Sequence, residues 1–178
     1  MASRSMKVYW DPPNSGWLKL NTDGSSLGNP GQSSYGGVVR NTHGEWVCGY
    51  VGNIGYNTSL AAEIWGIMMG LRFIRVMGLN NVVIETDSQA ALLLITVHGV
   101  DESDPLSSMI NSCKNDMAQL KCYMVHVKRD KNRCADLMAR LGRTQVEDFV
   151  VYDDPPANLI PLLNEDAAGE SLGLFTTM

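Results

Sequence analysis

Four acidic residues stand where a carboxylate is either unneeded or locally unfavourable. Asp23 follows an alternating run, Asp87 follows a β-branched run, and Glu63 and Asp136 interrupt otherwise apolar helical patterns. Each also has a simple structural interpretation: Asp23 as the cap of a glycine-rich turn, Asp87 as a helix cap, Glu63 as a favourable charge near a helix N-terminus, and Asp136 as a solvent-facing residue. Taken singly, the four residues leave a structural role and a chemical role open.

Glu63 is the most informative of the four acids. It does not complete a capping box, because the candidate caps Thr58 and Ser59 are at the wrong offset. Its neighbours in "SLAAEIW" are apolar, which predicts a buried edge. A carboxylate at such an edge needs a partner cation.

The four carboxylates could act together if the fold brings them to one place. This requires the strands that end at Asp23 and Asp87 to be neighbours running the same way, with the two helical acids reaching in. Converging carboxylates repel one another unless divalent cations neutralise them, and oxygen-only ligands suit Mg²⁺ or Mn²⁺ rather than zinc. Two such ions close together can activate a water and stabilise the leaving oxygen of a phosphodiester, so the chemistry would be metal-assisted hydrolysis.

The residues around Asp23 follow a strand period. Leu18, Leu20 and Thr22 fall on one face, and Trp17, Lys19, Asn21 and Asp23 fall on the other. The run "GSSLGNPGQSS" then predicts a turn that ends this strand after Asp23. The segments "YGGVVR" and "WVCGYVG" predict the next two strands, which "NTHG" joins, so the first three strands should form an antiparallel meander.

Helical and strand patterns follow the meander. A helix is predicted from Leu60 to Met77, capped by Thr58 or Ser59 and stopped by Gly78. The further predicted elements are, in order, a buried strand in "NNVVIETD", a helix over Ser88–His98, a helix from Pro105 to about Leu120, a strand in "YMVHV" and a helix from Arg133 to about Leu141. This order predicts an α/β fold with a five-stranded mixed sheet and helices on both faces.

Length and composition are those of one globular domain with tails. The chain has 178 residues, of which 44% are hydrophobic and 19% charged, enough to bury a core. We expect an extended lead-in over residues 1–16, a folded domain over 17–143, and an acidic, proline-containing tail over 144–178 that either docks on the body or stays mobile. No apolar run reaches 18 residues and no secretory signal is evident, so a soluble intracellular protein is expected, in the nucleus or the cytoplasm. The four scattered cysteines predict reduced core thiols.

The net charge of −5 is unevenly distributed. Residues 144–178 hold seven acids and no Lys or Arg, which leaves fourteen bases against twelve acids in residues 1–143. Within the body, Lys121 to Arg143 carries seven bases and two acids. The acidity therefore belongs to the tail, and the body offers one basic segment to an anionic partner.

In this order and context, the motifs resemble type 1 ribonucleases H of the ribonuclease H-like superfamily. "NTDGSSLGNPGQSSYGGVVR" is similar to the family's first strand, turn and second strand, "AAEIWGIMMGL" to its glutamate helix, "IETDSQAAL" to its second aspartate and "NRCADLMA" to its last. The flanks "WDPPNSGWLKLNTDGS" and "DDPPANLIPLLNED" resemble the plant branch, often found in retrotransposon-derived proteins. The resemblance covers about residues 8–143 and, more loosely, the tail.

The resemblance implies an activity and a set of residues. The activity is endonucleolytic hydrolysis of the RNA strand of an RNA–DNA hybrid by a monomer with two Mg²⁺ ions, or Mn²⁺, without a membrane or a small-molecule cofactor. The catalytic residues and metal ligands would be Asp23, Glu63, Asp87 and Asp136. Substrate contacts would come from Gly28, Asn29, Pro30, Gly31 and Gln89, near the 2′-hydroxyls that distinguish RNA, and from Lys128, Arg129, Lys131 and Arg133 on phosphates. Alternatively, "GNPG" only makes a tight hairpin and the basic residues form a solvated loop.

Two departures from the family pattern keep other functions open. Residues 128–134 lack the histidine that many members carry before the last aspartate, and His126 lies in the preceding strand, where a structural role is expected. The acidic "HGVDESDP" replaces the basic protrusion of some members. The alternative hypothesis is therefore a domesticated domain that binds hybrid or structured RNA without cutting it. A DNA-directed nuclease of the same superfold, such as an integrase, is a third hypothesis, which "GNPG" disfavours.

Overall fold

The computed structural model describes residues 8–171, with side chains described through Gly169. Along this part of the chain the elements are, in order, β1 (Leu18–Gly28), β2 (Gly31–Arg40), β3 (Trp46–Asn57), α1 (Ser59–Val76), β4 (Val82–Thr86), α2 (Gln89–Leu93) continued by a π-helical turn (Leu94–His98), α3 (Ser107–Gln119), β5 (Cys122–His126), a 3₁₀ turn (Arg129–Lys131), α4 (Arg133–Gly142), β6 (Val150–Tyr152), a second 3₁₀ turn (Ala157–Leu159) and α5 (Ile160–Ser171). No helix among the described residues is long and apolar enough to cross a bilayer.

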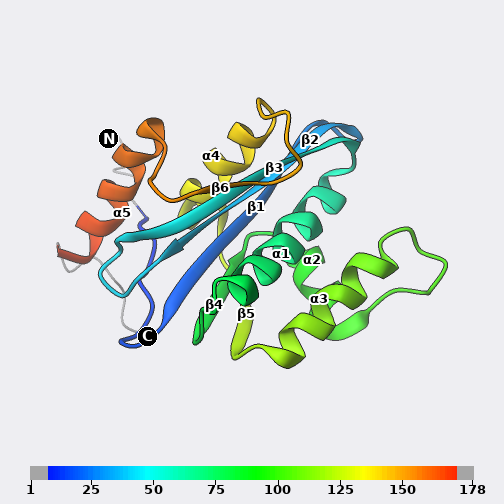
Figure 1. Ribbon diagram of the computed structural model, residues 1–178, viewed down its shortest axis with the longest axis horizontal. Coiled ribbons are helices and arrows are strands. Elements are labelled where there is room, and N and C mark those ends of the chain that lie inside the picture. The colour runs from blue at the N-terminus through cyan, green and yellow to red at the C-terminus, as the bar shows by residue number, and fades with distance from the viewer. Residues whose placement is uncertain (1–7, 172–178) are drawn as a thin grey trace, which may run out of the picture.

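One six-stranded sheet runs through the described chain in the spatial order β5-β4-β1-β2-β3-β6 (Figure 1). β1, β2 and β3 form the predicted antiparallel meander, and β4 and β5 continue the sheet parallel to β1. The predicted mixed sheet is confirmed, but the count of five strands is wrong by one. The additional strand, β6, comes from the tail and pairs antiparallel with β3. Its three residues are too few for a periodic pattern to distinguish them from a loop.

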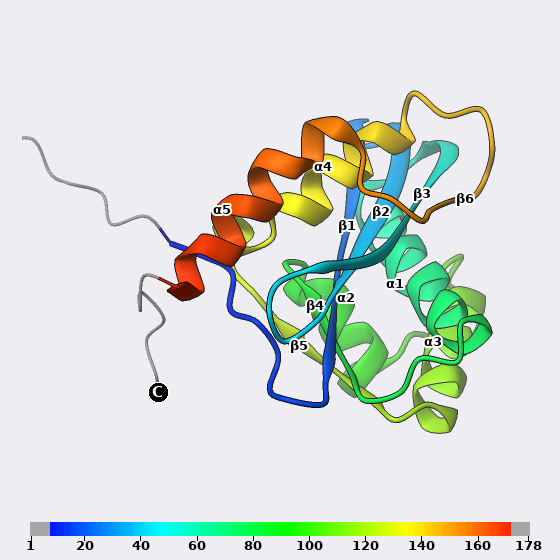
Figure 2. The ribbon, with the colours of Figure 1, turned by 60° about the vertical axis from the view of Figure 1, so that its left-hand side comes forward.

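Helices cover both faces of the sheet, as predicted. α1 and α3 lie on the first face, over the larger group of buried apolar side chains, to which Leu20 and Ile67 belong. α4 and α5 lie side by side on the second face (Figure 2). A smaller group there includes Val38, Met138 and Leu163, so the tail contributes to the core of the second face.

The tail docks on the body over its described part. β6 extends the sheet, Trp46 Nε1 donates a hydrogen bond to the Asp153 carbonyl at 2.8 Å, and the side chain of Leu159 is fully buried. This settles the two alternatives for residues 144–171, while residues 172–178 lie outside the described residues. The described part of the lead-in, residues 8–16, forms no regular element, yet Trp10 is buried within it.

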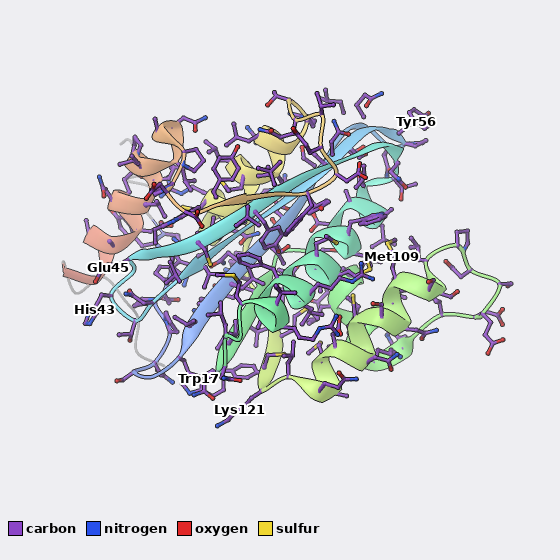
Figure 3. The ribbon with its side chains drawn as sticks, viewed as in Figure 1. Trp17, His43, Glu45, Tyr56, Met109 and Lys121 are labelled. Atoms are coloured by element: carbon purple, nitrogen blue, oxygen red, sulfur yellow. The ribbon has the colours of Figure 1, made fainter. Side chains whose placement is uncertain are left out.

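The prediction that β1 ends at Asp23 is wrong. β1 continues to Gly28 and stays in register with β2 throughout, from Lys19↔Arg40 to Gly28↔Gly31. Glycine and serine favour turns when read locally, but here β2 supplies hydrogen-bonding partners for each of them. The turn itself is confined to the tip, where the Asn29–Pro30 peptide bond is cis. Asp23 therefore lies in the middle of a strand. Figure 3 shows Tyr56 at this hairpin end of the sheet and Trp17 at the opposite end.

The predicted helices are present with small changes at their ends. Thr58 caps α1, because its side chain accepts a hydrogen bond from the Ala61 N–H at 3.1 Å. The predicted helix over Ser88–His98 is α-helical only as far as Leu93 and then becomes a π-helical turn. Cys48, Cys113 and Cys134 are buried and Cys122 is half-buried, so three of the four thiols lie in the core as expected.

Candidate metal centre

Three of the four singled-out carboxylates meet beside β1, just past the end of β4. β1 and β4 are parallel neighbours in which Thr22 pairs with Thr86, so Asp23 and Asp87 follow at adjacent positions. Glu63 reaches them from the second turn of α1. One carboxylate oxygen from each of the three lies within 4.8 Å of the others, and no second group of three acidic, His or Cys side chains meets this criterion among residues 8–171.

Gly24 allows α1 to come close enough for Glu63 to reach Asp23. A Cβ atom at Gly24 would overlap the backbone of Ala62 and Glu63. On the other face, a Cβ atom at Gly36, which pairs with Asp23, would overlap the backbone of α4 at Met138. The glycine after Asp23 is thus required for helix packing rather than for a turn.

The local electrostatics favour a cation at this centre. Burial and the neighbouring Glu63 carboxylate raise the pKa of Asp23 far above its ordinary value. Burial raises the pKa of Glu63 to about 7, although contacts with Asp23 and Gly24 oppose the increase. Burial also raises the pKa of Asp87, against the effects of the Arg129 charge and the Asn132 side chain. Carboxylates held this way are neutralised either by protons or by a metal ion.

An unpaired oxygen provides an independent test of whether a metal fits. Glu63 Oε2 is buried and has no hydrogen-bond partner within the described residues. Leaving a buried carboxylate oxygen unpaired is costly, and a divalent cation would remove that cost. The donor set is made of carboxylate oxygens alone, which suits Mg²⁺ or Mn²⁺. The residues present therefore fit such an ion.

Asp136 lies beside this group rather than within it. It sits in the first turn of α4, and its Oδ2 lies 2.7 Å from Arg140 Nη2 one turn later. Its charge nevertheless contributes to raising the pKa of both Asp23 and Asp87. Asp136 is thus close enough to act on the centre electrostatically, while its carboxylate is paired with an arginine.

A groove of about 390 Å³ opens over the carboxylates. It is lined by Asn29, Ser59, Leu60, Glu63, Asp87, Ser88, Ala90 and Arg129. Asn29 Oδ1 accepts a hydrogen bond from the Ser59 N–H at 3.0 Å, which ties the hairpin tip to the start of α1. The predicted contact residue Gln89 is exposed at the first position of α2, beside the groove. Gly28 and Pro30 are exposed at the hairpin tip, whereas Gly31 is buried.

The four predicted phosphate-binding residues differ in their surroundings. Arg129 lines the groove, and Lys128 is exposed next to it. Lys131 Nζ instead lies 2.7 Å from Asp11 Oδ2 in the lead-in. Arg133 lies 2.9 Å from Glu165 and 3.4 Å from Asp166, both in α5. Only Arg129 is brought to the carboxylate centre.

Sequence reasoning missed the buried amides behind the centre. Asn21 and Asn132 are fully buried, and their side chains share a 3.0 Å hydrogen bond. The strand alternation did place Asn21 on the face of Asp23, but an isolated asparagine gives no sign of its partners. His126 lies 3.2 Å from the carbonyl oxygen of Asp87, in line with the structural role expected of it.

The sequence resembles known proteins over most of its length. Residues 21–142 match the model of a protein family described as reverse transcriptase-like. An Arabidopsis thaliana protein named "Putative ribonuclease H protein" is 36% identical over 165 residues, which make up 92% of this chain and 26% of the relative. The chain therefore spans about a quarter of the length of that relative.

Solved structures resemble the chain in fold. RNase H1 of the halophilic archaeon Halobacterium salinarum is 26% identical, with a TM-score of 0.65 over 71% of this chain and 97% of that one. An RNase H1 isolated from compost, solved in complex with an RNA/DNA hybrid, is 22% identical, with a TM-score of 0.64 over 71% and 96% of the two chains. The family model leaves the lead-in, β6 and α5 outside the matched residues.

Proposed function

Because this chain belongs to the ribonuclease H-like family and has its fold, we propose that it is a metal-dependent endonuclease that hydrolyses the RNA strand of RNA–DNA hybrids. The observation that carries the proposal is the meeting of Asp23, Glu63 and Asp87 within 4.8 Å, with a buried glutamate oxygen left unpaired. The Arabidopsis thaliana relative supports a place in the plant branch, with a retrotransposon-derived origin as part of the proposal.

Asp23, Glu63 and Asp87 would hold the metal, with Asp136 as the fourth ligand. Mg²⁺ is the proposed ion, at two positions, with Mn²⁺ as a substitute. When bound, the ions supply an activated water and neutralise the charge on the leaving oxygen of the phosphodiester. The Asp23 side chain contacts both Glu63 and Asp87, so it is the residue on which we expect metal binding to depend most. Asp136 could join only after its carboxylate rotates away from Arg140 or shares it, since the two are paired at 2.7 Å.

The groove residues would position the hybrid. We assign Arg129 to the phosphate next to the scissile bond, because it is the basic residue of its segment that lines the groove. Asn29 and its hairpin neighbours Gly28 and Pro30 would lie against the edge of the hybrid where the 2′-hydroxyls are displayed. Gln89 would add a polar contact beside them. Lys131 and Arg133 are paired with other parts of the chain, so we assign them a lesser part in binding phosphates than Arg129.

One panel of substrates tests the proposal. The same sequence is offered as RNA–DNA hybrid, double-stranded RNA, double-stranded DNA and single-stranded RNA, each with Mg²⁺, with Mn²⁺ or with a chelator. The expected result is cleavage of the RNA strand in the hybrid alone, abolished by the chelator and leaving 5′-phosphate and 3′-hydroxyl ends. Binding of the hybrid without cleavage in either metal would support the non-cleaving binding module instead. Preferred cleavage of the DNA duplex would support a DNA-directed nuclease.

A further inference from the structure

A fully buried arginine joins the sheet to the docked tail. Arg40, at the end of β2, has no exposed surface, and its Nη1 lies 2.7 Å from Asp166 Oδ2 in α5. The indole ring of Trp10, from the lead-in, stacks on the guanidinium with the central carbon 3.7 Å from the ring centre. A buried guanidinium requires such partners, because an unpaired charge in the interior is strongly destabilising. Both Trp10 and Asp166 lie outside the residues that the family model matches.

Arg40 begins a chain of buried hydrogen bonds that leads to the carboxylate centre. Arg40 Nη2 donates to Asn21 Oδ1 at 2.9 Å, and Trp10 Nε1 donates to the same oxygen at 2.8 Å. Asn21 Nδ2 then donates to Asn132 Oδ1 at 3.0 Å. Asn132 Nδ2 donates in turn to the carbonyl oxygen of Thr22 at 3.1 Å.

The direction of every bond in this chain is set from both sides, by the donors at its start and by the Glu85 carboxylate and the Thr22 carbonyl, which can only accept. Arginine and the indole N–H can only donate, so they force Asn21 to present its oxygen to them. The Asn21 amide group must then point the other way, to Asn132 and to Glu85 Oε1 at 3.0 Å. Asn132 in turn has no choice but to accept from Asn21 and donate to Thr22. A carboxamide without such neighbours could flip by half a turn at little cost.

The far end of the chain lies next to two of the proposed ligands. Thr22 directly precedes Asp23 in β1. The backbone carbonyl of Asn132 accepts the N–H of Asp136 at 3.1 Å, so Asn132 begins the turn of α4 that carries this acid. Fixing Asn132 therefore fixes the spacing between the β1 carboxylate and the α4 carboxylate.

We propose that Arg40, Trp10 and Asp166 are positioning residues for the metal centre: the docked lead-in and tail lock the Asn21 and Asn132 amides in one orientation and thereby hold in place the β1 backbone at Asp23 and the first turn of α4, which carries Asp136. The part of this inference that concerns catalysis rests on the proposed function. Its structural part concerns metal binding alone and can be measured without substrate. The tail is then a working part of the catalytic unit rather than an appendage.

Two variants of the full chain separate positioning from stability. The double variant Arg40→Met/Asp166→Leu replaces both buried charges by apolar side chains, which often preserves folding, and it deletes the donor to Asn21. Trp10→Phe deletes only the indole donor and keeps a ring over Arg40. The control is Arg75→Met/Asp116→Leu, which makes the same exchanges at an ion pair of 2.5 Å between α1 and α3 on the opposite face, where Arg75 is exposed and Asp116 buried.

The readouts are Mn²⁺ affinity without substrate, kcat and KM on the hybrid, and the melting temperature. The double variant is expected to lose about tenfold in Mn²⁺ affinity and in kcat with KM within twofold, as for other residues that orient metal ligands. Trp10→Phe is expected to lose about threefold in the same two quantities. The control should lose less than twofold, as should Asp166→Glu, which keeps a carboxylate as the partner of Arg40.

Wild-type Mn²⁺ affinity and kcat in the folded double variant would overturn the inference, as would equal losses in the control. If the double variant does not fold, Trp10→Phe decides, and wild-type values there overturn it. A wild-type chain that binds Mn²⁺ but does not cut the hybrid would refute the proposed function while leaving the Mn²⁺ comparison to decide this inference.

Discussion

At the residue scale, the structure bears on the simple structural roles that were open to three of the acids. Ser88, not Asp87, caps α2, because its Oγ accepts a hydrogen bond from the Ala91 N–H at 3.2 Å. Glu63 lies past the first turn of α1, and its side chain is turned toward Asp23 instead of solvent. Asp136 is half-buried and paired with Arg140, so it is neither solvent-facing nor part of the tight group of three.

Arg129 is predicted to be the phosphate contact among the basic residues of its segment. Arg129→Ala is expected to raise KM for the hybrid about fivefold and to reduce the slope of log KM against log salt by about one, because one charge no longer contacts a phosphate. Lys131→Ala serves as the matched control, since Lys131 is paired with Asp11 and should change KM less than twofold. Equal effects of the two variants, measured by steady-state kinetics across a salt series, would contradict the assignment.

At the element scale, periodicity predicted faces well and strand ends poorly. The alternation of residues 17–23 correctly separated Leu20 and Thr22 from Asn21 and Asp23. It placed the end of β1 five residues too early, because glycine and serine mark turns only when no neighbouring strand pairs with them. That pairing is a tertiary contact, and the local sequence does not contain it.

Gly24 is predicted to be required for the approach of α1 to β1. Gly24→Ala would place a methyl group on the backbone of Glu63, so the helix must move and take the carboxylate with it. We expect a loss of about 2–3 kcal/mol in the free energy of unfolding and a large loss of hybrid cleavage. Gly55→Asn is the control, because nothing lies within 4 Å there and asparagine tolerates its positive φ of 67°. Urea unfolding and cleavage rates of both variants test this, and an active, stable Gly24→Ala protein would refute it.

At the scale of the whole molecule, the charge separation seen in the sequence is partly internal. The tail carries the acidity, as the composition indicated, but Asp166 pairs with Arg40, and Glu165 pairs with Arg133. These pairs join residues more than thirty positions apart, so no local pattern could reveal them. The four acids could be chosen from the sequence because they follow strand patterns or interrupt apolar helical patterns. The docking of the tail could not be predicted, because it depends on contacts that only the complete fold creates.

The metal-free protein is predicted to lose stability as the pH rises. Burial keeps the Glu63 proton bound in the folded state up to a pKa of about 7, while the unfolded chain releases it near 4.5. The folded state therefore binds more protons between these values, and Glu63 alone contributes a fall of about 2–3 kcal/mol in the free energy of unfolding across this window. Urea unfolding in a chelator at pH 5 and pH 8 measures the fall.

Glu63→Gln isolates this effect because it removes the titrating group. The fall in the free energy of unfolding between pH 5 and pH 8 should therefore be smaller in the variant than in wild type by that amount. Mg²⁺ should restore wild-type stability at pH 8 and leave the variant less affected, since binding to the folded state alone stabilises it. An identical pH dependence in wild type and variant would show that Glu63 is not held in this way.

The most direct test of the metal centre is cleavage of an RNA–DNA hybrid by Asp23→Asn beside the wild type, in Mg²⁺. The exchange keeps the shape of the side chain and removes the charge of the residue that contacts both Glu63 and Asp87. We predict that kcat falls about a thousandfold while the variant stays folded, and that the exposed tail variant Asp153→Asn keeps wild-type activity. Equal rates of cleavage by wild type and Asp23→Asn would contradict the account.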